Sequence, residues 1–249
     1  MPVYYNEHDP FAARWLRNLI AAGLIPDGDV DERDIREVDP SELRQYTQWH
    51  FFGGIGGWPY ALRLAGWPDD WPVLTGSPPC QPFSTAGKRL GADDERDLAP
   101  VWLRHIGELR PPVVFGEQVA NAVGFGWLDG VLDALELAGY AAGAVVLPAC
   151  AVGAPHRRER IFVVADAYGG GLEKPQGLQR GRLGARRRGP WDSPRLVRTE
   201  HGTYPLEPGL EPLAHGVPAR VGRLRAYGNA IVPQLAAEVV KAWIEARHS

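Results

Sequence analysis

Cysteine is scarce in this chain of 249 residues, which contains only Cys80 and Cys150. A chain of this length buries a core without disulfides, so we interpret both residues as reduced thiols. No apolar run approaches the roughly 18 residues that a membrane span requires. The start, MPVYYNEHDP, also has no basic segment followed by an apolar one. We therefore expect a cytoplasmic protein without a membrane segment.

The chain also lacks a strong net charge, which is formally -3 at pH 7. This value argues against a protein that coats nucleic acid through its overall charge, although a local cluster of cations can still bind phosphates. Such a cluster lies between Lys174 and Arg198, whereas the carboxylates concentrate in the first hundred residues. Its arginines are Arg180, Arg182, Arg186, Arg187, Arg188 and Arg195.

Strand-like apolar runs alternate with runs of helical spacing along most of the chain. We expect strands at 2–7, 30–35, 46–52, 72–76, 111–117, 141–149 and 160–167. We expect helices at 10–23, from about 40, at 58–66, 98–109, 126–139 and 227–246. This alternation predicts an α/β fold with a doubly wound, mostly parallel sheet and helices on both faces.

The alternation stops in residues 168–221, where Gly, Pro and Arg dominate without a usable period. We expect one domain made of residues 1–167 and completed by 222–249, with 168–221 as a small separate lobe or a long loop. For residues 172–190 alone, a basic disordered linker is an equally good interpretation.

Three features lie where predicted strands end, which is where open α/β sheets bind ligands. The glycine-rich turn 52–57 would let a ligand approach the backbone, although such a turn can also be merely tight. Glu7 and Asp34 are placed to accept hydrogen bonds from a nucleoside, although each carboxylate alone could be ordinary surface charge.

Cys80 stands in the segment SPPCQPFS, after another predicted strand. A buried structural thiol is the ordinary interpretation of a cysteine. Prolines on both sides and a polar loop make this a poor core position, so we favour a nucleophile.

These segments resemble the motifs of DNA cytosine-5 methyltransferases. PPCQPFS is similar to the catalytic PCQ motif and FGGIGG to the FxGxGG cofactor motif. VVFGEQV resembles the strand that ends in ENV, APHRRERIF the QxRxR motif, and YGNAIVPQLAAEVV the closing GN motif with its helix. The resemblance implies the class I methyltransferase fold, S-adenosyl-L-methionine as cofactor, double-stranded DNA as partner, no metal and a monomer. Residues 1–167 with 222–249 would form the catalytic and cofactor-binding domain, and 168–221 the target-recognition lobe.

The order of the motifs departs from that of the family. YYNEHDPFAARWL resembles the second motif and ERDIREVDPSEL the third, yet both precede the first. Because strand positions in a sheet need not follow chain order, we expect the site to keep its layout in space. The resemblance then places these residues around the cofactor: Phe52, Gly53, Gly54, Ile55, Gly56, Gly57, Glu7, His8, Asp34, Ile35, Pro79, Asn229 and Ala230.

Three further residues differ from the family pattern. Gln118 replaces the Asn beside the catalytic Glu, His156 replaces the Gln that opens QxRxR, and His50 replaces the acidic residue that usually ends the first-motif strand. None of these changes removes a group that makes or breaks a bond. We expect altered orientation or rate rather than loss of activity.

The resemblance also implies a mechanism. Cys80 would attack carbon 6 of a cytosine flipped out of the duplex, and Glu117 would protonate or hydrogen-bond ring nitrogen 3. An extended segment HRRER would place Arg158 and Arg160 on one face, toward the base and phosphates, and leave Arg157 toward solvent. The expected DNA contacts are Gln81, Ser84, Lys88 and Arg89 in the loop after Cys80, and Arg180, Arg182, Arg186, Arg187 and Arg188 in the lobe.

Two other functions fit the sequence. The substrate could be transfer RNA, as in a sister family, or the chain could be a catalytically weak accessory protein that binds DNA. A restriction-modification enzyme, a phage or prophage self-protection enzyme and a solitary methyltransferase would share this sequence pattern.

Overall fold

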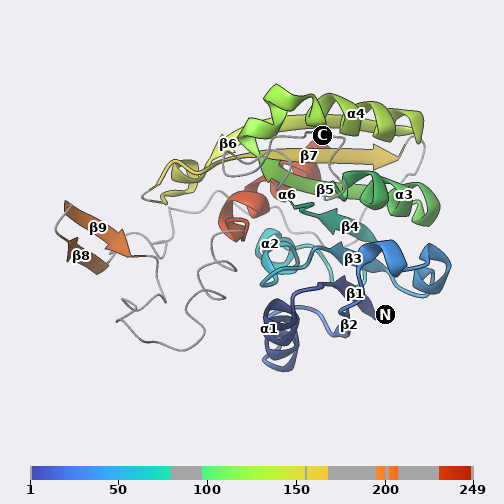
Figure 1. The fold of residues 1–249 in the computed structure, drawn as a ribbon, viewed down its shortest axis with the longest axis horizontal. Coiled ribbons are helices and arrows are strands. Elements are labelled where there is room, and N and C mark those ends of the chain that lie inside the picture. The colour runs from blue at the N-terminus through green and yellow to red at the C-terminus, as the bar shows by residue number, and fades with distance from the viewer. Residues whose placement is uncertain are drawn as a thin grey trace.

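A seven-stranded sheet forms the centre of the molecule, with strand order β2-β1-β3-β4-β5-β7-β6. The computed structural model describes residues 2–79, 97–154, 156–167, 195–199, 202–206 and 230–247. The strands of this sheet are β1 Val3–Asn6, β2 Gly28–Asp31, β3 Gln48–Phe51, β4 Val73–Gly76, β5 Val113–Val119, β6 Tyr140–Pro148 and β7 Glu159–Ala167. Strands β1 to β5 are parallel, and β7 runs antiparallel to both of its neighbours. The predicted doubly wound, mostly parallel sheet is thus confirmed (Figure 1).

The two earliest strands lie on the far side of β3 from β4. β3 pairs with β1 on one edge and with β4 on the other, and β2 extends the sheet beyond β1. In chain order, the two strands at one edge of the sheet, β1 and β2, therefore come first, and the chain then continues with β3 in the interior of the sheet. The carboxyl ends of β1, β3 and β4 consequently lie side by side, because adjacent parallel strands end at the same edge.

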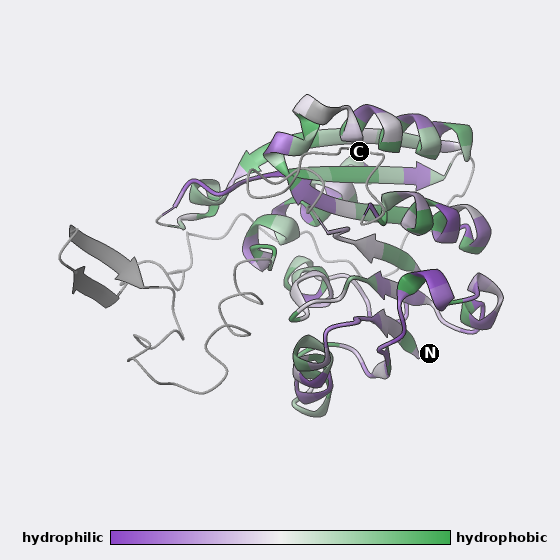
Figure 2. Cartoon of the chain, viewed as in Figure 1, coloured by the Kyte–Doolittle hydropathy of each residue, from purple (hydrophilic) through white to green (hydrophobic). Residues whose placement is uncertain are grey.

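Helices cover both faces of the sheet, because successive side chains point to opposite faces and all those of β1, β3 and β4 are buried. The described helices are α1 Pro10–Ala21, α2 Gly57–Ala65, α3 Ala99–Leu109, α4 Trp127–Leu137 and α6 Pro233–Arg247, with 3-10 turns η1 Ile35–Glu37, η2 Pro40–Leu43, η5 Ala120–Phe125 and η6 Ala149–Val152. On one face α1 packs on β1, and α2 and α6 pack on β5 and β7. On the other face lie α3, α4 and the turns η1 and η2. Figure 2 shows hydrophobic residues along most of β7 and a mixture of hydrophilic and hydrophobic residues along α3 and α4.

The sharp start of α1 fixes the chain just after β1. Asp9 is the N-cap, and its Oδ1 accepts hydrogen bonds from the backbone N–H groups of Phe11 at 2.8 Å and Ala12 at 3.1 Å. Pro10 occupies the first helical position, where a missing N–H costs nothing. Glu7 therefore stands between the end of a strand and a capped helix.

In the described part of the chain, no helix is long and apolar enough to cross a membrane.

Four predicted elements were wrong in part, and one of them is the last helix, which begins at Pro233 rather than at residue 227. The second strand spans Gly28–Asp31 rather than 30–35, because Asp34 caps a 3-10 turn that begins at Ile35. The helix expected from residue 40 is only the 3-10 turn Pro40–Leu43. The region expected to be irregular contains an antiparallel hairpin of β8 Arg195–Thr199 and β9 Gly202–Leu206.

Candidate active site

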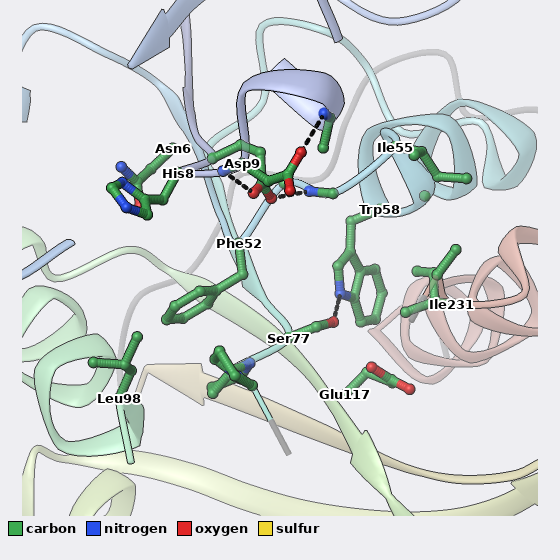
Figure 3. Close-up of a pocket in the computed structure, with 18 of the residues that line it drawn as sticks. Asn6, His8, Asp9, Phe52, Ile55, Trp58, Ser77, Leu98, Glu117 and Ile231 are labelled. Carbon is green, nitrogen blue, oxygen red and sulfur yellow. Dashed lines mark hydrogen bonds between the residues drawn. The ribbon is translucent and has the colours of Figure 1, made fainter. Parts of the chain in front are cut away.

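A cavity of about 780 Å³ opens at the carboxyl edge of the parallel strands. The segments that follow β1, β2, β3 and β4 all reach it, together with β5, β7 and the residues before α6. Its lining includes the predicted Glu7, His8, Asp34, Ile35, Phe52, Gly53, Gly54, Ile55, Gly57, Pro79, Glu117, Arg160 and Ala230. Figure 3 shows Phe52 and Leu98 toward one side of this space and Trp58 and Ile231 toward the other.

Glu7 joins the end of β1 to the glycine-rich turn. Its Oε2 accepts a hydrogen bond from the Gly54 N–H at 2.7 Å, and its Oε1 accepts one from the Asp9 N–H at 2.8 Å. Burial raises the pKa of the Glu7 carboxyl above its ordinary value of 4.5, and the two backbone N–H groups oppose that rise. A carboxylate with one donor on each oxygen still has lone pairs that can accept hydrogen bonds from hydroxyl groups in the cavity.

The turn after β3 keeps its backbone open to the cavity. Gly54 has φ 53°, a conformation that favours glycine, and Phe52 adopts the same φ although it carries a side chain. A Cβ on Gly57 would lie 2.6 Å from Cγ1 of Ile231. Gly56 is the one predicted residue of this turn that does not line the cavity. It has φ 82°, and a Cβ added there would lie 2.7 Å from Leu19 of α1.

Asp34 reaches the cavity from the loop after β2. Its Oδ1 accepts hydrogen bonds from the Arg36 backbone N–H and from Arg36 Nε, both at 2.9 Å, and its Oδ2 accepts one from Arg36 Nη2 at 2.6 Å. These bonds lower the pKa of Asp34 to about 2. The carboxyl is therefore ionised and fixed in orientation at neutral pH.

Glu117 and Arg160 form an ion pair at the inner end of the cavity. Arg160 Nε lies 2.8 Å from Glu117 Oε1, and the two side chains are only 15% and 6% exposed. Burial raises the pKa of Glu117, whereas Arg160 and a hydrogen bond from Ser77 lower it. Ser77 Oγ also accepts a hydrogen bond from Trp58 Nε1 at 3.1 Å, so its own proton is available to the carboxylate (Figure 3). The arrangement holds a carboxyl that can change protonation state beside a fixed guanidinium.

The arginine segment is not extended throughout, contrary to the prediction, although Arg158 and Arg160 both lie close enough to Glu117 to lower its pKa. Arg158 has φ 31° and precedes β7, so the segment is not extended there. Its Nη2 instead donates to the Ala230 carbonyl at 2.7 Å, which ties the segment to the chain before α6. Arg157 is 80% exposed and pairs with Glu159 at 2.9 Å, in agreement with the prediction that it faces solvent.

Two of the three departures from the family pattern have a clear structural setting. His50 is fully buried in β3, where its Nδ1 shares a hydrogen bond with Thr75 Oγ1 at 2.8 Å and its pKa is lowered to about 3 by burial. Gln118 Nε2 donates to the Pro78 carbonyl at 3.1 Å, so it holds the loop that leads to Cys80. Neither residue adds a charge to the site.

The family model for C-5 cytosine-specific DNA methylases matches residues 3–172. The chain belongs to this family. It is 30% identical over 178 residues to the type II methyltransferase M.AgeI of Thalassovita gelatinovora, a match that covers 70% of this chain and 36% of that protein. It is 38% identical over 162 residues to M.NaeI of Lentzea aerocolonigenes, covering 64% and 33% of the two chains. The chain spans less than half the length of these two relatives.

A structural comparison finds a DNMT2 mutant of Spodoptera frugiperda with a TM-score of 0.47 and 18% identity. The likeness covers 72% of this chain and 45% of that chain. The cofactor of the cytosine-5 methylase family is S-adenosyl-L-methionine. Among the described residues, no group of three or more His, Cys, Asp or Glu is placed to hold a metal ion.

Some predicted site residues fall outside the described part of the chain. They are Cys80, Gln81, Ser84, Lys88, Arg89, Arg180, Arg182, Arg186, Arg187, Arg188 and Asn229. Conversely, the cavity lining includes residues that the sequence analysis missed, among them Asn6, Asp9, Trp58, Ser77, Leu98 and Ile231. Ser77 directly follows a predicted strand and Asn6 is the next-to-last residue of another, positions that could have drawn attention to them.

Proposed function

We propose that this chain transfers a methyl group from S-adenosyl-L-methionine to carbon 5 of cytosine in DNA. The observation that carries the proposal is the buried pair of Glu117 and Arg160 in the same cavity as Glu7 and the glycine-rich turn. Pro79, the residue before Cys80, also lines that cavity. A nucleophile that follows Pro79 would therefore act next to a proton-donating carboxyl and a fixed cation.

The outer part of the cavity suits the cofactor. A buried Glu7 with remaining lone pairs matches the two donor hydroxyls of a ribose, and the ionised Asp34 matches the amino group of an adenine. A Cβ at Gly54 would meet only the Phe52 carbonyl oxygen within 4 Å, at 3.9 Å, so the glycine leaves space beside its backbone for a ligand. When bound, S-adenosyl-L-methionine supplies an electrophilic methyl group. Phe52, Ile35 and Ile231 provide apolar surface beside it.

The reaction itself requires activation of the cytosine ring, because carbon 5 is a poor nucleophile. The Cys80 thiolate would add to carbon 6, while protonated Glu117 donates a proton to ring nitrogen 3. Arg160 would hold the Glu117 carboxyl in place and help to stabilise negative charge near the base. After transfer, removal of the proton from carbon 5 would expel the Cys80 thiolate.

The target cytosine must leave the duplex to reach a cavity at the edge of a sheet. We propose that the loop after Cys80, through Gln81, Ser84, Lys88 and Arg89, closes over the flipped base. The arginines of the lobe 168–221 would contact phosphates and base edges, since a guanidinium can serve both purposes. Residues 1–167 and 222–249 would form the catalytic domain, which we propose acts on double-stranded DNA as a monomer.

Incubation with labelled S-adenosyl-L-methionine and either duplex DNA or transfer RNA tests this proposal. We expect label on carbon 5 of cytosine in DNA, and none with Cys80→Ser. Label on transfer RNA alone would identify the RNA substrate instead. Cofactor binding without transfer to either nucleic acid would indicate an accessory protein.

A further inference from the structure

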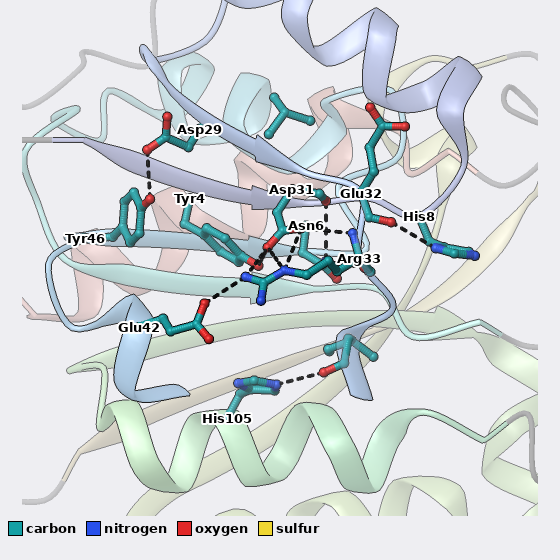
Figure 4. Close-up of polar contacts among 12 residues, drawn as sticks. Tyr4, Asn6, His8, Asp29, Asp31, Glu32, Arg33, Glu42, Tyr46 and His105 are labelled. Atoms are coloured by element: carbon teal, nitrogen blue, oxygen red, sulfur yellow. Dashed lines mark hydrogen bonds and ion pairs between the residues drawn. The ribbon is translucent and has the colours of Figure 1, made fainter. Parts of the chain in front are cut away.

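Asn6 ends β1 and is 2% exposed, although its side chain is polar. Its Nδ2 donates to the Arg33 carbonyl at 2.9 Å and to the Asp31 carbonyl at 3.4 Å, both in the segment that leads from β2 to Asp34 (Figure 4). The amide nitrogen has two protons, and each is directed to one of these carbonyls. The Asn6 side chain therefore fixes the path of the loop that carries Asp34.

The backbone of Asn6 holds the opposite side of the cavity. Its carbonyl accepts a hydrogen bond from the Gly53 N–H at 2.9 Å, at the start of the glycine-rich turn. The next residue, Glu7, bonds to Gly54 of the same turn. Asn6 thus lies between the two loops, and it lines the cavity between them.

The position of Asn6 between the two loops follows from the order of the strands in the sheet. The loop after β2 and the turn after β3 are not neighbours in the sheet, since β1 separates them. The end of β1 provides a direct hydrogen-bonded link between them, beside the contacts of His105 with both Ile35 and Phe51. Buried polar groups hold such a position in one geometry, because an unpaired partner would cost free energy.

We propose that Asn6 is a positioning residue for the cofactor, which sets the distance between the Asp34 loop and the glycine-rich turn. The inference rests on the proposed binding of S-adenosyl-L-methionine in this cavity. Substitution of Asn6 should therefore lower the affinity for the cofactor in protein that is still folded.

Gln48 provides a matched control for the stability effect. It is 1% exposed at the start of β3, and its Nε2 donates to the carbonyls of Pro68 and Trp71, each at 3.0 Å. It thus makes the same kind of bonds from a neighbouring strand, but at the opposite end of the sheet from the cavity. If Asn6 had a purely structural role, Asn6→Ala and Gln48→Ala would have the same effect on cofactor affinity.

The test is calorimetric titration of Asn6→Ala, Asn6→Asp and Gln48→Ala with S-adenosyl-L-methionine, below the melting transition of each variant. Asn6→Asp keeps the shape but replaces the donor by an acceptor, so it should not restore the affinity. Asn6→Ser, which keeps one donor, serves if the other Asn6 variants do not fold. We expect the dissociation constant to rise about tenfold or more for the Ala and Asp variants of Asn6, which corresponds to about 1.4 kcal/mol. Gln48→Ala should bind like wild type.

Steady-state kinetics supply a second readout. For the Asn6 variants, KM for the cofactor should rise while kcat at saturating cofactor stays near wild type. The hydrogen bonds of the Asn6 side chain go to the carbonyls of Asp31 and Arg33, and not to Glu117 or Arg160. Equal affinity of wild type and Asn6→Ala, or an equal loss in Gln48→Ala, would overturn the inference. Absence of cofactor binding by wild type would instead overturn the proposed function.

Discussion

The Glu7 carboxylate accepts a hydrogen bond from the backbone N–H of Gly54 at 2.7 Å. In the chain, Glu7 precedes the glycine-rich turn, whereas the resembling family motifs come in the opposite order. The pairing of β1 with β3 explains how the two still meet, because both strands end at the same edge of the sheet. The rearranged order of motifs is therefore compatible with a single cofactor site.

Removal of the Glu7 carboxyl should weaken cofactor binding. Glu7→Ala loses an acceptor for two ribose hydroxyls, which should cost about 1.5 to 3 kcal/mol, or roughly a tenfold to hundredfold loss of affinity. Glu32→Ala is the control, because Glu32 pairs with Arg17 at 2.7 Å and does not line the cavity. Calorimetric titration with S-adenosyl-L-methionine measures both. Unchanged affinity for Glu7→Ala would remove the N-terminal segment from the cofactor site.

Cofactor affinity should also depend on pH through Glu7. The pKa of this carboxyl lies above 4.5, and only its ionised form accepts two ribose hydrogen bonds. Affinity should therefore be full at pH values well above the raised pKa and fall as the pH drops through it. Glu7→Gln should bind more weakly at neutral pH and show a flatter profile over the acidic range. A titration series in which wild type and Glu7→Gln have parallel pH profiles would contradict this assignment.

The sequence predicted the features that depend on local pattern. The strand before Glu7, the helix closed by Gly23 and the neighbouring strands β6 and β7 follow from apolar spacing and turn residues. The sequence did not reveal where the second strand ends. It ends at Asp31 rather than at Ile35, because the Asp34 side chain caps a 3-10 turn. It also did not show the φ of Arg158 or the bonds of Asn6, because these depend on strands that are brought together only in the folded sheet.

Ser77 should tune the acid that protonates the base. Its hydrogen bond stabilises ionised Glu117, so Ser77→Ala should raise the pKa of Glu117 further. Because the proposed reaction uses protonated Glu117, the rate should fall as pH rises through that pKa. The alkaline limb of the single-turnover rate should then move to higher pH by about one unit, the size expected for a hydrogen bond to a charged group. Trp58→Phe is the control, because it leaves the Ser77 proton in place and should shift the alkaline limb less. Coincident alkaline limbs for wild type and Ser77→Ala would be evidence that Ser77 does not set the pKa of Glu117.

The buried ion pair of Arg160 with Glu117 should contribute more to the free energy of unfolding than the exposed pair of Arg157 with Glu159. Arg160→Ala leaves a buried carboxylate without its cation, which should lower the free energy of unfolding by about 3 kcal/mol at neutral pH. Arg157→Ala breaks a pair in which the arginine is 80% exposed and should cost less than about 1 kcal/mol. The loss in Arg160→Ala should shrink at acidic pH, where Glu117 is protonated. Urea unfolding at both pH values measures these differences, and equal losses for the two variants would argue against the buried pair.

Covalent trapping tests the central claim most directly. With duplex DNA that carries 5-fluorocytosine at its target sites, carbon 5 has no proton to lose after methyl transfer, so Cys80 should remain bonded to carbon 6. We predict a denaturant-resistant protein–DNA adduct that requires S-adenosyl-L-methionine, maps to Cys80 by mass spectrometry and is absent from Cys80→Ser. An active enzyme that forms no such adduct, or forms it at another residue, would contradict the account.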